Sequence, residues 1–155
     1  MAVSASLAGA LNQVGLQIVK SLQAELQRQG INVSGELSRS ITHQVVGADD
    51  GVYLEISMDD YGQYIDEGRK SSKRGGPKQT WRYKIDNWIK LRGITPRQPG
   101  MTQKQLAFLI TRKINQRGFK AKPFIDKGIN NVITQDLSGI FAKAIEQDIA
   151  IIFQK

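Results

Sequence analysis

The sequence predicts a single α+β domain over residues 1–155, with a small antiparallel β-sheet packed against a long N-terminal helix and several C-terminal helices. Two patterns support this. Near both ends of the chain, apolar residues recur every three or four positions, as on one face of an α-helix. Over residues 52–58 they alternate with polar residues, as in a half-buried strand. A chain of 155 residues with 40% apolar residues can bury one core.

The N-terminal segment 1–30 predicts a long amphipathic helix that begins near Ser4 and ends near Gln29. Ser4 or Ser6 can cap its start, and Gly30 suits the position after its end. Its apolar stripe consists of Leu7, Leu11, Val14, Ile18, Leu22 and Leu26.

A short helix and a β-hairpin are expected next. Ser34 can cap a helix that runs to Ile41. Residues 42–46 and 52–58 then form two antiparallel strands, because residues 48–51 (Ala-Asp-Asp-Gly) have the composition of a turn.

Residues 59–68 predict a second short helix, with Asp59 or Asp60 as its cap and Gly68 as its end. One face of this helix combines Tyr61, Tyr64 and Ile65, which we expect in the core rather than in a ligand platform. Residues 69–79 (RKSSKRGGPKQ) are expected to be a flexible basic loop.

Two further helices are predicted before residue 118. The first covers residues 80–92 and is ended by Gly93. The second begins with the capping box of Thr102 and Gln105 and is ended by Gly118. Its apolar stripe consists of Leu106, Leu109, Ile110 and Ile114.

The C-terminal part begins with an extended segment and continues as helix. Residues 119–122 are expected to be extended and to add a third strand, because Pro123 disfavours helix in the residue before it. A long last helix starts near Phe124, with a break near Gln135. The apolar tail 150–155 is expected to pack on another subunit.

The charge is strongly polarised along the chain, whose net charge is +8. Residues 69–122 contain 16 lysines and arginines against one acid, Asp86, whereas the rest of the chain contains six basic and 13 acidic residues. This pattern indicates an anionic partner, either nucleic acid or an acidic protein surface. A solvated basic loop would give the same pattern.

Enzymatic chemistry is not expected, and neither is a metal or another cofactor. The chain has no cysteine and one histidine, His43, which excludes thiolate catalysis and clusters of Cys or His ligands. The acidic pairs fit a turn, a helix cap and a helix end better than a catalytic cleft. These pairs are Asp49/Asp50, Asp59/Asp60 and Asp66/Glu67. No apolar run is long enough to span a membrane.

Nucleic-acid binding through the basic segment 69–122 is an alternative reading. Within residues 81–92, Trp81, Tyr83 and Trp88 are interleaved with basic residues, the mixture found on phosphate-binding and base-stacking surfaces. The two tryptophans also fit a buried helix face. No helix-turn-helix, RRM or zinc-finger pattern is present.

Three segments in order resemble the neck and tail-completion proteins of tailed bacteriophages, the head-tail joining and lambda-like minor tail proteins. They are residues 34–41 (SGELSRSI), 61–68 (YGQYIDEG) and 106–125, which end in AKPFI. The matching motif positions include Tyr61, Tyr64, Gly68, Gly118, Pro123 and Phe124.

This resemblance implies a structural virion protein, neither an enzyme nor a cofactor protein. Such proteins are assembled in the bacterial host cytoplasm and form a homo-oligomeric ring, often of six copies, between the portal-side connector and the tail tube. The long N-terminal helix and the basic loop 69–79 depart from the family pattern.

Charge complementarity gives two hypotheses for the candidate residues. Acidic residues of one copy would meet the basic segment of the next, or the basic loop would face genomic DNA in the lumen of the ring. The candidates are Asp59, Asp60, Asp66, Glu67, Arg69, Lys70, Lys73, Arg74 and Lys78.

Overall fold

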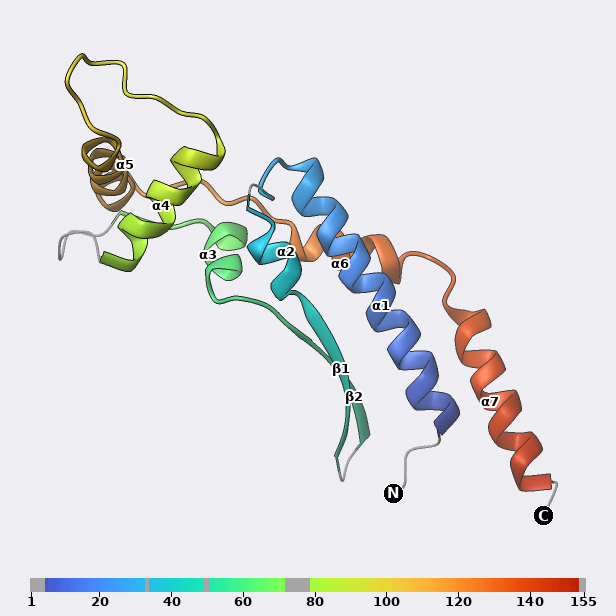
Figure 1. Ribbon diagram of the computed structural model, residues 1–155. Helices are drawn as coiled ribbons and strands as arrows, with labels where there is room; N and C mark the ends of the chain where they lie inside the picture. Colours follow the sequence, from blue (N-terminus) through green and yellow to red (C-terminus); the bar gives the residue numbers. More distant parts are fainter. Residues whose placement is uncertain (1–4, 33, 49–50, 72–78, 154–155) are drawn as a thin grey trace.

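The computed structural model describes residues 5–32, 34–48, 51–71 and 79–153, with the backbone alone at 79–81 and 151–153 (Figure 1). It is a mixed α+β fold, as the sequence predicts. The elements are α1 (Ala5–Arg28), α2 (Glu36–Ser40), β1 (Thr42–Ala48), β2 (Gly51–Ser57), α3 (Tyr61–Glu67), α4 (Gln79–Leu91), α5 (Gln103–Arg117), α6 (Ile125–Ile133) and α7 (Ser138–Phe153).

Helix α1 is the centre of the fold, because α6, α7 and the β-hairpin all pack on it (Figure 1). The predicted apolar stripe is confirmed from Val14 to Leu26, and Leu22 and Leu26 are fully buried. The main core consists of Val14, Ile18, Leu22, Leu26, Leu37, Ile41, Phe124 and Val132. We call this part of the molecule, residues 5–68 and 119–153, the body.

A glycine in α6 allows this helix to approach α1 closely. A Cβ atom added at Gly128 would lie 2.6 Å from Leu22 Cδ2 and 3.1 Å from Leu22 Cα. The sequence shows Gly128 only as a weak helix former, whereas the structure shows that it fits a tight helix contact.

The predicted hairpin is confirmed, with antiparallel register from Thr42↔Ser57 to Ala48↔Gly51. Leu54 and Ile56 of β2 pack against the core. Asp49 and Asp50 of the predicted turn lie outside the described residues.

The predicted third strand is wrong for the described part of the chain, where the sheet has two strands. Phe119 instead forms an isolated bridge with Arg69. The backbone N–H of Lys122 donates to Ile65 O of α3 at 2.9 Å. The segment 119–122 therefore hydrogen-bonds to the C-terminal end of α3 and to Arg69 just after it, rather than to the edge of the hairpin.

Helices α4 and α5 pack chiefly on each other and form a separate lobe, residues 79–117, which we call the basic lobe (Figure 1). The capping box of Thr102 and Gln105 is confirmed, and Gly93 and Gly118 follow the two helices with φ of 61° and 70°. Ile89, Ala107 and Thr111 form its buried contacts.

The predicted apolar stripe of α5 is partly wrong. Leu109 is exposed, and the buried positions are the smaller residues Ala107 and Thr111. Thr111 can face α4 because its Oγ1 donates to Ala107 O at 2.6 Å, which satisfies the buried hydroxyl. Trp88 lies at the edge of the buried face and is partly exposed.

The predicted break in the C-terminal helix is confirmed, since α6 ends at Ile133 and α7 begins at Ser138. Asp136 accepts a hydrogen bond from Ser138 N at 2.9 Å. Hydrogen bonding from Ser138, mainly from its side chain and next from this backbone N–H, lowers the pKa of the Asp136 carboxyl.

The cap assignments of the two short helices need correction. Asp60 precedes α3, but its backbone is already helical and its side chain makes no capping hydrogen bond. Gly35, with φ of 74°, is the N-cap of α2, and Ser34 acts from one residue earlier by accepting a 3.3 Å hydrogen bond from Glu36 N.

Candidate functional site

The chain passes from the body to the basic lobe and back again where two backbone segments cross. The chain leaves α3 through Gly68 and Arg69 and returns from α5 through Gly118 and Phe119. Arg69 N donates to Phe119 O at 3.0 Å, and Phe119 N donates to Arg69 O at 2.9 Å. These two reciprocal bonds close the base of the lobe.

Both glycines at the crossing have backbone angles that favour glycine alone. Gly68 has φ 75° and ψ 180°, and Gly118 has φ 70° and ψ −165°. A Cβ atom at Gly68 would lie 2.6 Å from Ala121 N, and one at Gly118 would collide with Arg69 O. The two segments can therefore cross closely only with glycine at both positions.

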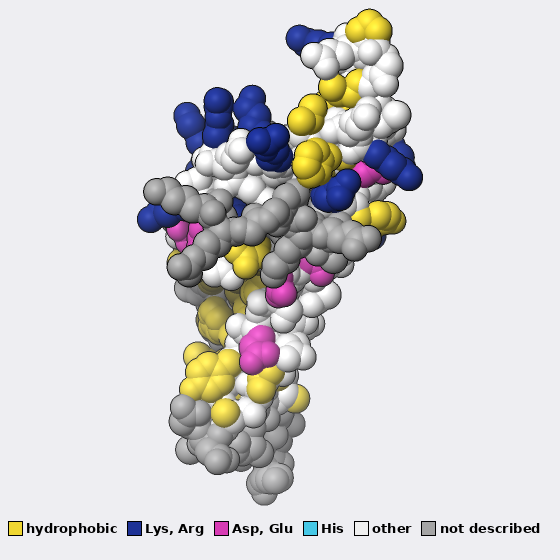
Figure 2. Space-filling view, turned by 90° about the vertical axis from the view of Figure 1, so that its left-hand side faces the viewer, with side chains coloured by type: hydrophobic (Ala, Val, Ile, Leu, Met, Phe, Trp, Pro, Cys, Tyr) yellow, Lys and Arg dark blue, Asp and Glu magenta, His cyan; other side chains and the backbone are white. Residues whose placement is uncertain are grey.

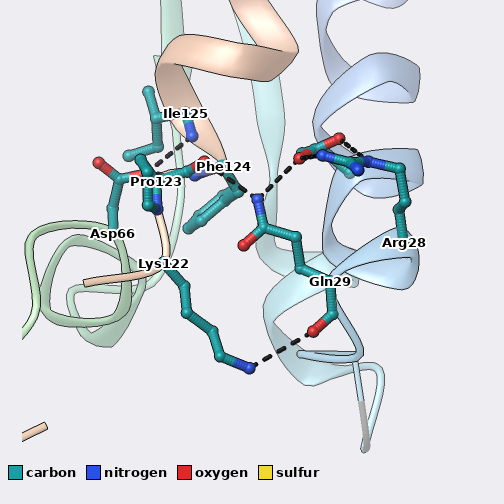
Figure 3. Close-up of polar contacts among 8 residues, drawn as sticks. Arg28, Gln29, Asp66, Lys122, Pro123, Phe124 and Ile125 are labelled. Atoms are coloured by element: carbon teal, nitrogen blue, oxygen red, sulfur yellow. Dashed lines mark hydrogen bonds and ion pairs between the residues drawn. The ribbon is translucent and has the colours of Figure 1, made fainter. Parts of the chain in front are cut away.

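Asp66 connects α3 to the start of α6 (Figure 3). Its Oδ1 accepts hydrogen bonds from Phe124 N at 2.7 Å and from Ile125 N at 2.8 Å. A helix start carries unpaired N–H groups and a partial positive charge, so a carboxylate stabilises it there. Asp66 therefore has a role within the chain through its Oδ1 atom, and its predicted contact with a neighbouring copy stays a prediction.

The C-terminal end of α1 reaches the same junction (Figure 3). Gln29 Nε2 donates to Pro123 O at 3.0 Å and to Glu25 Oε1 at 2.7 Å, and Lys122 Nζ approaches Gln29 O at 3.4 Å. Phe124 is fully buried beside this network. The motif positions Gly118, Pro123 and Phe124 thus lie along one segment, 118–124, which runs past Gly68 and the C-terminal end of α3.

Glu25 is a buried acid that the sequence interpretation missed. Only 4% of it is exposed, and its carboxylate accepts 2.7 and 2.5 Å hydrogen bonds from the Arg28 guanidinium. The hydrogen bonds from Arg28, which have the largest effect, and the one from Gln29 lower the pKa of Glu25 to about 2. The sequence signal was available, because Glu25 lies three residues after Leu22 on the apolar stripe and three before Arg28.

The other acidic candidates are exposed on the surface of the body. Asp59 and Asp60 lie before α3, and Glu67 lies at its end. Glu67 accepts a 3.0 Å hydrogen bond from Gln63. These three carboxylates remain candidates for contact with a partner.

The three residues predicted to share a core face separate in the structure. Tyr61 and Ile65 pack against the core, but Tyr64 is 51% exposed, which corrects its assignment. Lys84 Nζ of α4 lies 4.3 Å from the centroid of the Tyr61 ring, a cation–π contact between lobe and body. Burial raises the pKa of the Tyr61 hydroxyl.

The basic candidates are only partly covered by the structure. Arg69 is half-buried at the crossing and Lys70 is exposed, whereas Lys73, Arg74 and Lys78, with most of the expected loop 69–79, lie outside the described residues. Figure 2 shows lysine and arginine side chains gathered on the lobe end of the molecule. The exposed ones include Arg82, Lys84, Lys90, Arg92, Arg97, Lys104, Arg112, Lys113, Arg117, Lys120 and Lys122.

Asp86, the single acid of the basic segment 69–122, makes its contacts with other residues of the lobe. It forms a 2.8 Å ion pair with Lys90, which raises the pKa of that lysine. Its backbone oxygen accepts a 3.2 Å hydrogen bond from Gln103, which links α4 to the start of α5.

A groove of about 560 Å³ separates α4 from the body. Its lining is mainly apolar and aromatic, with contributions from Ile31, Tyr61, Ile65, Tyr83, Ile85, Trp88, Leu91 and Phe119. Its basic residues are Lys84, Arg92, Lys120 and Lys122, against one acid, Glu36. Arg92 Nη2 donates to Gly30 O at 2.6 Å and holds one end of α4 to the body.

The described residues show no group of three or more acidic or histidine side chains that could hold a metal ion. His43 lies beside α1 and hydrogen-bonds to Asn12 Oδ1 at 2.8 Å. No helix in the described ranges combines the length and the apolar character needed to cross a membrane.

No protein-family model matches the chain, and the searches of curated proteins and of solved structures give no match either.

Proposed function

We propose that the chain is a structural subunit of a tailed-bacteriophage virion, which forms a homo-oligomeric ring in the neck between the head connector and the tail tube. It needs no cofactor and catalyses no reaction. The phage assignment rests on the resemblance of residues 34–41, 61–68 and 106–125. It is supported by the position of Gly68 beside the segment 118–124, which carries the other three motif positions, Gly118, Pro123 and Phe124.

The observation that carries the assembly role is the amount of exposed apolar surface. In the described part of the chain, twelve large apolar side chains are exposed, as many as the apolar residues that are buried. Several lie together on single helices instead of being scattered, which is typical of protein–protein interfaces. They are Leu16, Tyr53, Tyr64, Tyr83, Trp88, Leu91, Ile94, Phe108, Leu109, Ile133, Ile145 and Ile149.

The charge distribution supports contact between unlike surfaces. Exposed basic residues occupy the lobe, whereas Asp59, Asp60 and Glu67 lie exposed on the body. A cyclic ring joins one patch of a subunit to a different patch of the next, so opposite charges on the two patches favour it.

The solution mass tests this proposal. We expect light scattering to give one closed oligomer of defined mass that persists at moderate salt and without DNA. Electron microscopy of the same sample should show rings with a central opening. A chain that stays monomeric at every concentration, both alone and with isolated phage connectors or tail tubes, would contradict the proposal.

A second candidate function is nucleic-acid binding by the basic lobe. One observation favours it: Arg82 lies 5.2 Å from the ring of Phe108, so a cation and an exposed aromatic side chain meet on the lobe surface. Phosphate contacts release counterions, so the affinity for duplex DNA should fall steeply as salt rises. An absence of binding even at low salt would exclude this candidate.

A further inference from the structure

The groove between α4 and the body is an open apolar surface with a basic rim. Trp88 and Leu91 of α4 line it and are exposed, as is Tyr83. Lys84, Arg92, Lys120 and Lys122 contribute four positive charges against the carboxylate of Glu36. This chemistry fits an occupant with an apolar face and at least one carboxylate.

The outer face of α7 has these properties. Ile145 and Ile149 lie one helical turn apart, and they are 56% and 47% exposed. Ala142 and the carboxylate of Glu146 lie next to them on the same side of the helix and are exposed as well. The opposite side of α7 packs on α1, where Ala144 is buried.

The two surfaces cannot meet within one chain. Figure 1 places α4 and α7 at opposite ends of the molecule, with α1 and the hairpin between them. A contact between them therefore joins two copies. Because it pairs two different patches, it is heterologous, and repetition of it builds a ring or a filament.

We propose that the outer face of α7 in one copy docks into the α4 groove of the next copy. Ile145 and Ile149 enter the apolar groove beside Trp88 and Leu91, and Glu146 lies against the basic rim. This inference rests on the proposed ring and adds to it the two surfaces that join neighbouring subunits.

Cysteine cross-linking tests the contact directly, because the chain has no cysteine of its own. The Ile149→Cys protein is mixed with the Leu91→Cys protein and treated with a short bismaleimide. We expect about tenfold more covalent dimer than in a matched mixture of Ile133→Cys with Leu91→Cys. Ile133 is a suitable control, because it is 59% exposed but lies on α6, outside both surfaces. Equal yields in the two mixtures would overturn the proposal.

A charge exchange at the rim gives a second readout with variants that leave the core unchanged. Glu146→Lys or Lys120→Glu alone should weaken self-association by about threefold, and the double variant should restore it. If the double variant instead associates even more weakly than either single variant, the proposed pairing of Glu146 with Lys120 is contradicted.

The outcomes also separate this inference from the proposed function. A closed ring whose mass and stability are unchanged by Ile149→Asp, with no cross-link above the control, overturns the docking contact but leaves the ring. Strong cross-linking in open chains or dimers that never close supports the contact and counts against the ring.

Discussion

Asp66 is the residue whose role changes most between sequence and structure. Its carboxylate accepts hydrogen bonds from Phe124 N and Ile125 N, 58 and 59 residues further along the chain. It therefore does for α6 what an N-cap residue does for its own helix. The other three acidic candidates, Asp59, Asp60 and Glu67, are more exposed than Asp66.

Replacement of Asp66 by alanine should lower the free energy of unfolding by about 2 kcal/mol, because two N–H groups at the start of α6 lose their acceptor. Urea denaturation measures this change. Asp60→Ala is the matched control, since Asp60 is exposed and makes no capping hydrogen bond. It should change stability by less than about 0.5 kcal/mol. Equal losses in the two variants would mean that the Asp66 contact contributes nothing.

Glu25 should make the stability depend on pH in the acid range. Its pKa falls from 4.5 to about 2 in the folded chain. The carboxylate therefore stabilises the fold fully above about pH 4.5, and this contribution is lost as the pH falls towards 2. The gap in urea midpoint between the wild type and Glu25→Gln should be constant near neutral pH and narrow below about pH 4.5. A gap that widens on acidification would contradict this assignment.

At the scale of elements, the crossing of the segments before α4 and after α5 depends on Gly118. Gly118→Ala should lower the free energy of unfolding by about 3 kcal/mol, because alanine would have a disfavoured backbone conformation and its Cβ atom would collide with Arg69 O. Gly93→Ala separates the two effects. Gly93 also has positive φ, but a Cβ atom there meets nothing within 4 Å. Gly93→Ala should therefore lower the free energy of unfolding by only about 1 kcal/mol. Similar values from urea denaturation would show that the close approach adds no cost.

Local patterns predicted the elements well, because each depends on neighbouring residues. The stripe of α1, the capping box of Thr102 and the break after α6 depend only on residues within a few positions of each other. The contacts across the chain could not be read this way. Asp66 reaches α6 and Arg69 pairs with Phe119 because of tertiary packing, which also left Tyr64 exposed while Tyr61 packs on the core.

The candidate site was predictable in its composition and not in its arrangement. The charge count identified the basic segment, and the structure shows its described residues to be largely exposed. The groove beside α4 was not foreseen, since it is lined by residues from α2, α3, α4 and the segments after α1 and α5. Sequence spacing carries no information on such distant segments.

For the whole molecule, the separate packing of lobe and body should appear in hydrogen exchange. Helices α4 and α5 pack chiefly on each other, whereas α1 packs on α6, α7 and the hairpin. A unit with fewer supporting contacts opens at lower free energy. Amides of α4 around Ile89 should therefore exchange at least about tenfold faster than those of α1 around Leu22. Equal protection of the two helices in exchange measured by NMR would show that the molecule opens as one unit.

The crossing at Arg69 and Phe119 also makes the basic lobe a modular insertion. The chain departs from the body and returns to it at two residues that are already paired. A segment of another length, charge or origin can therefore be grafted between them while α3 and α6 keep their places. Replacement of the lobe by an unrelated segment should therefore leave the core around Leu22 and Phe124 folded.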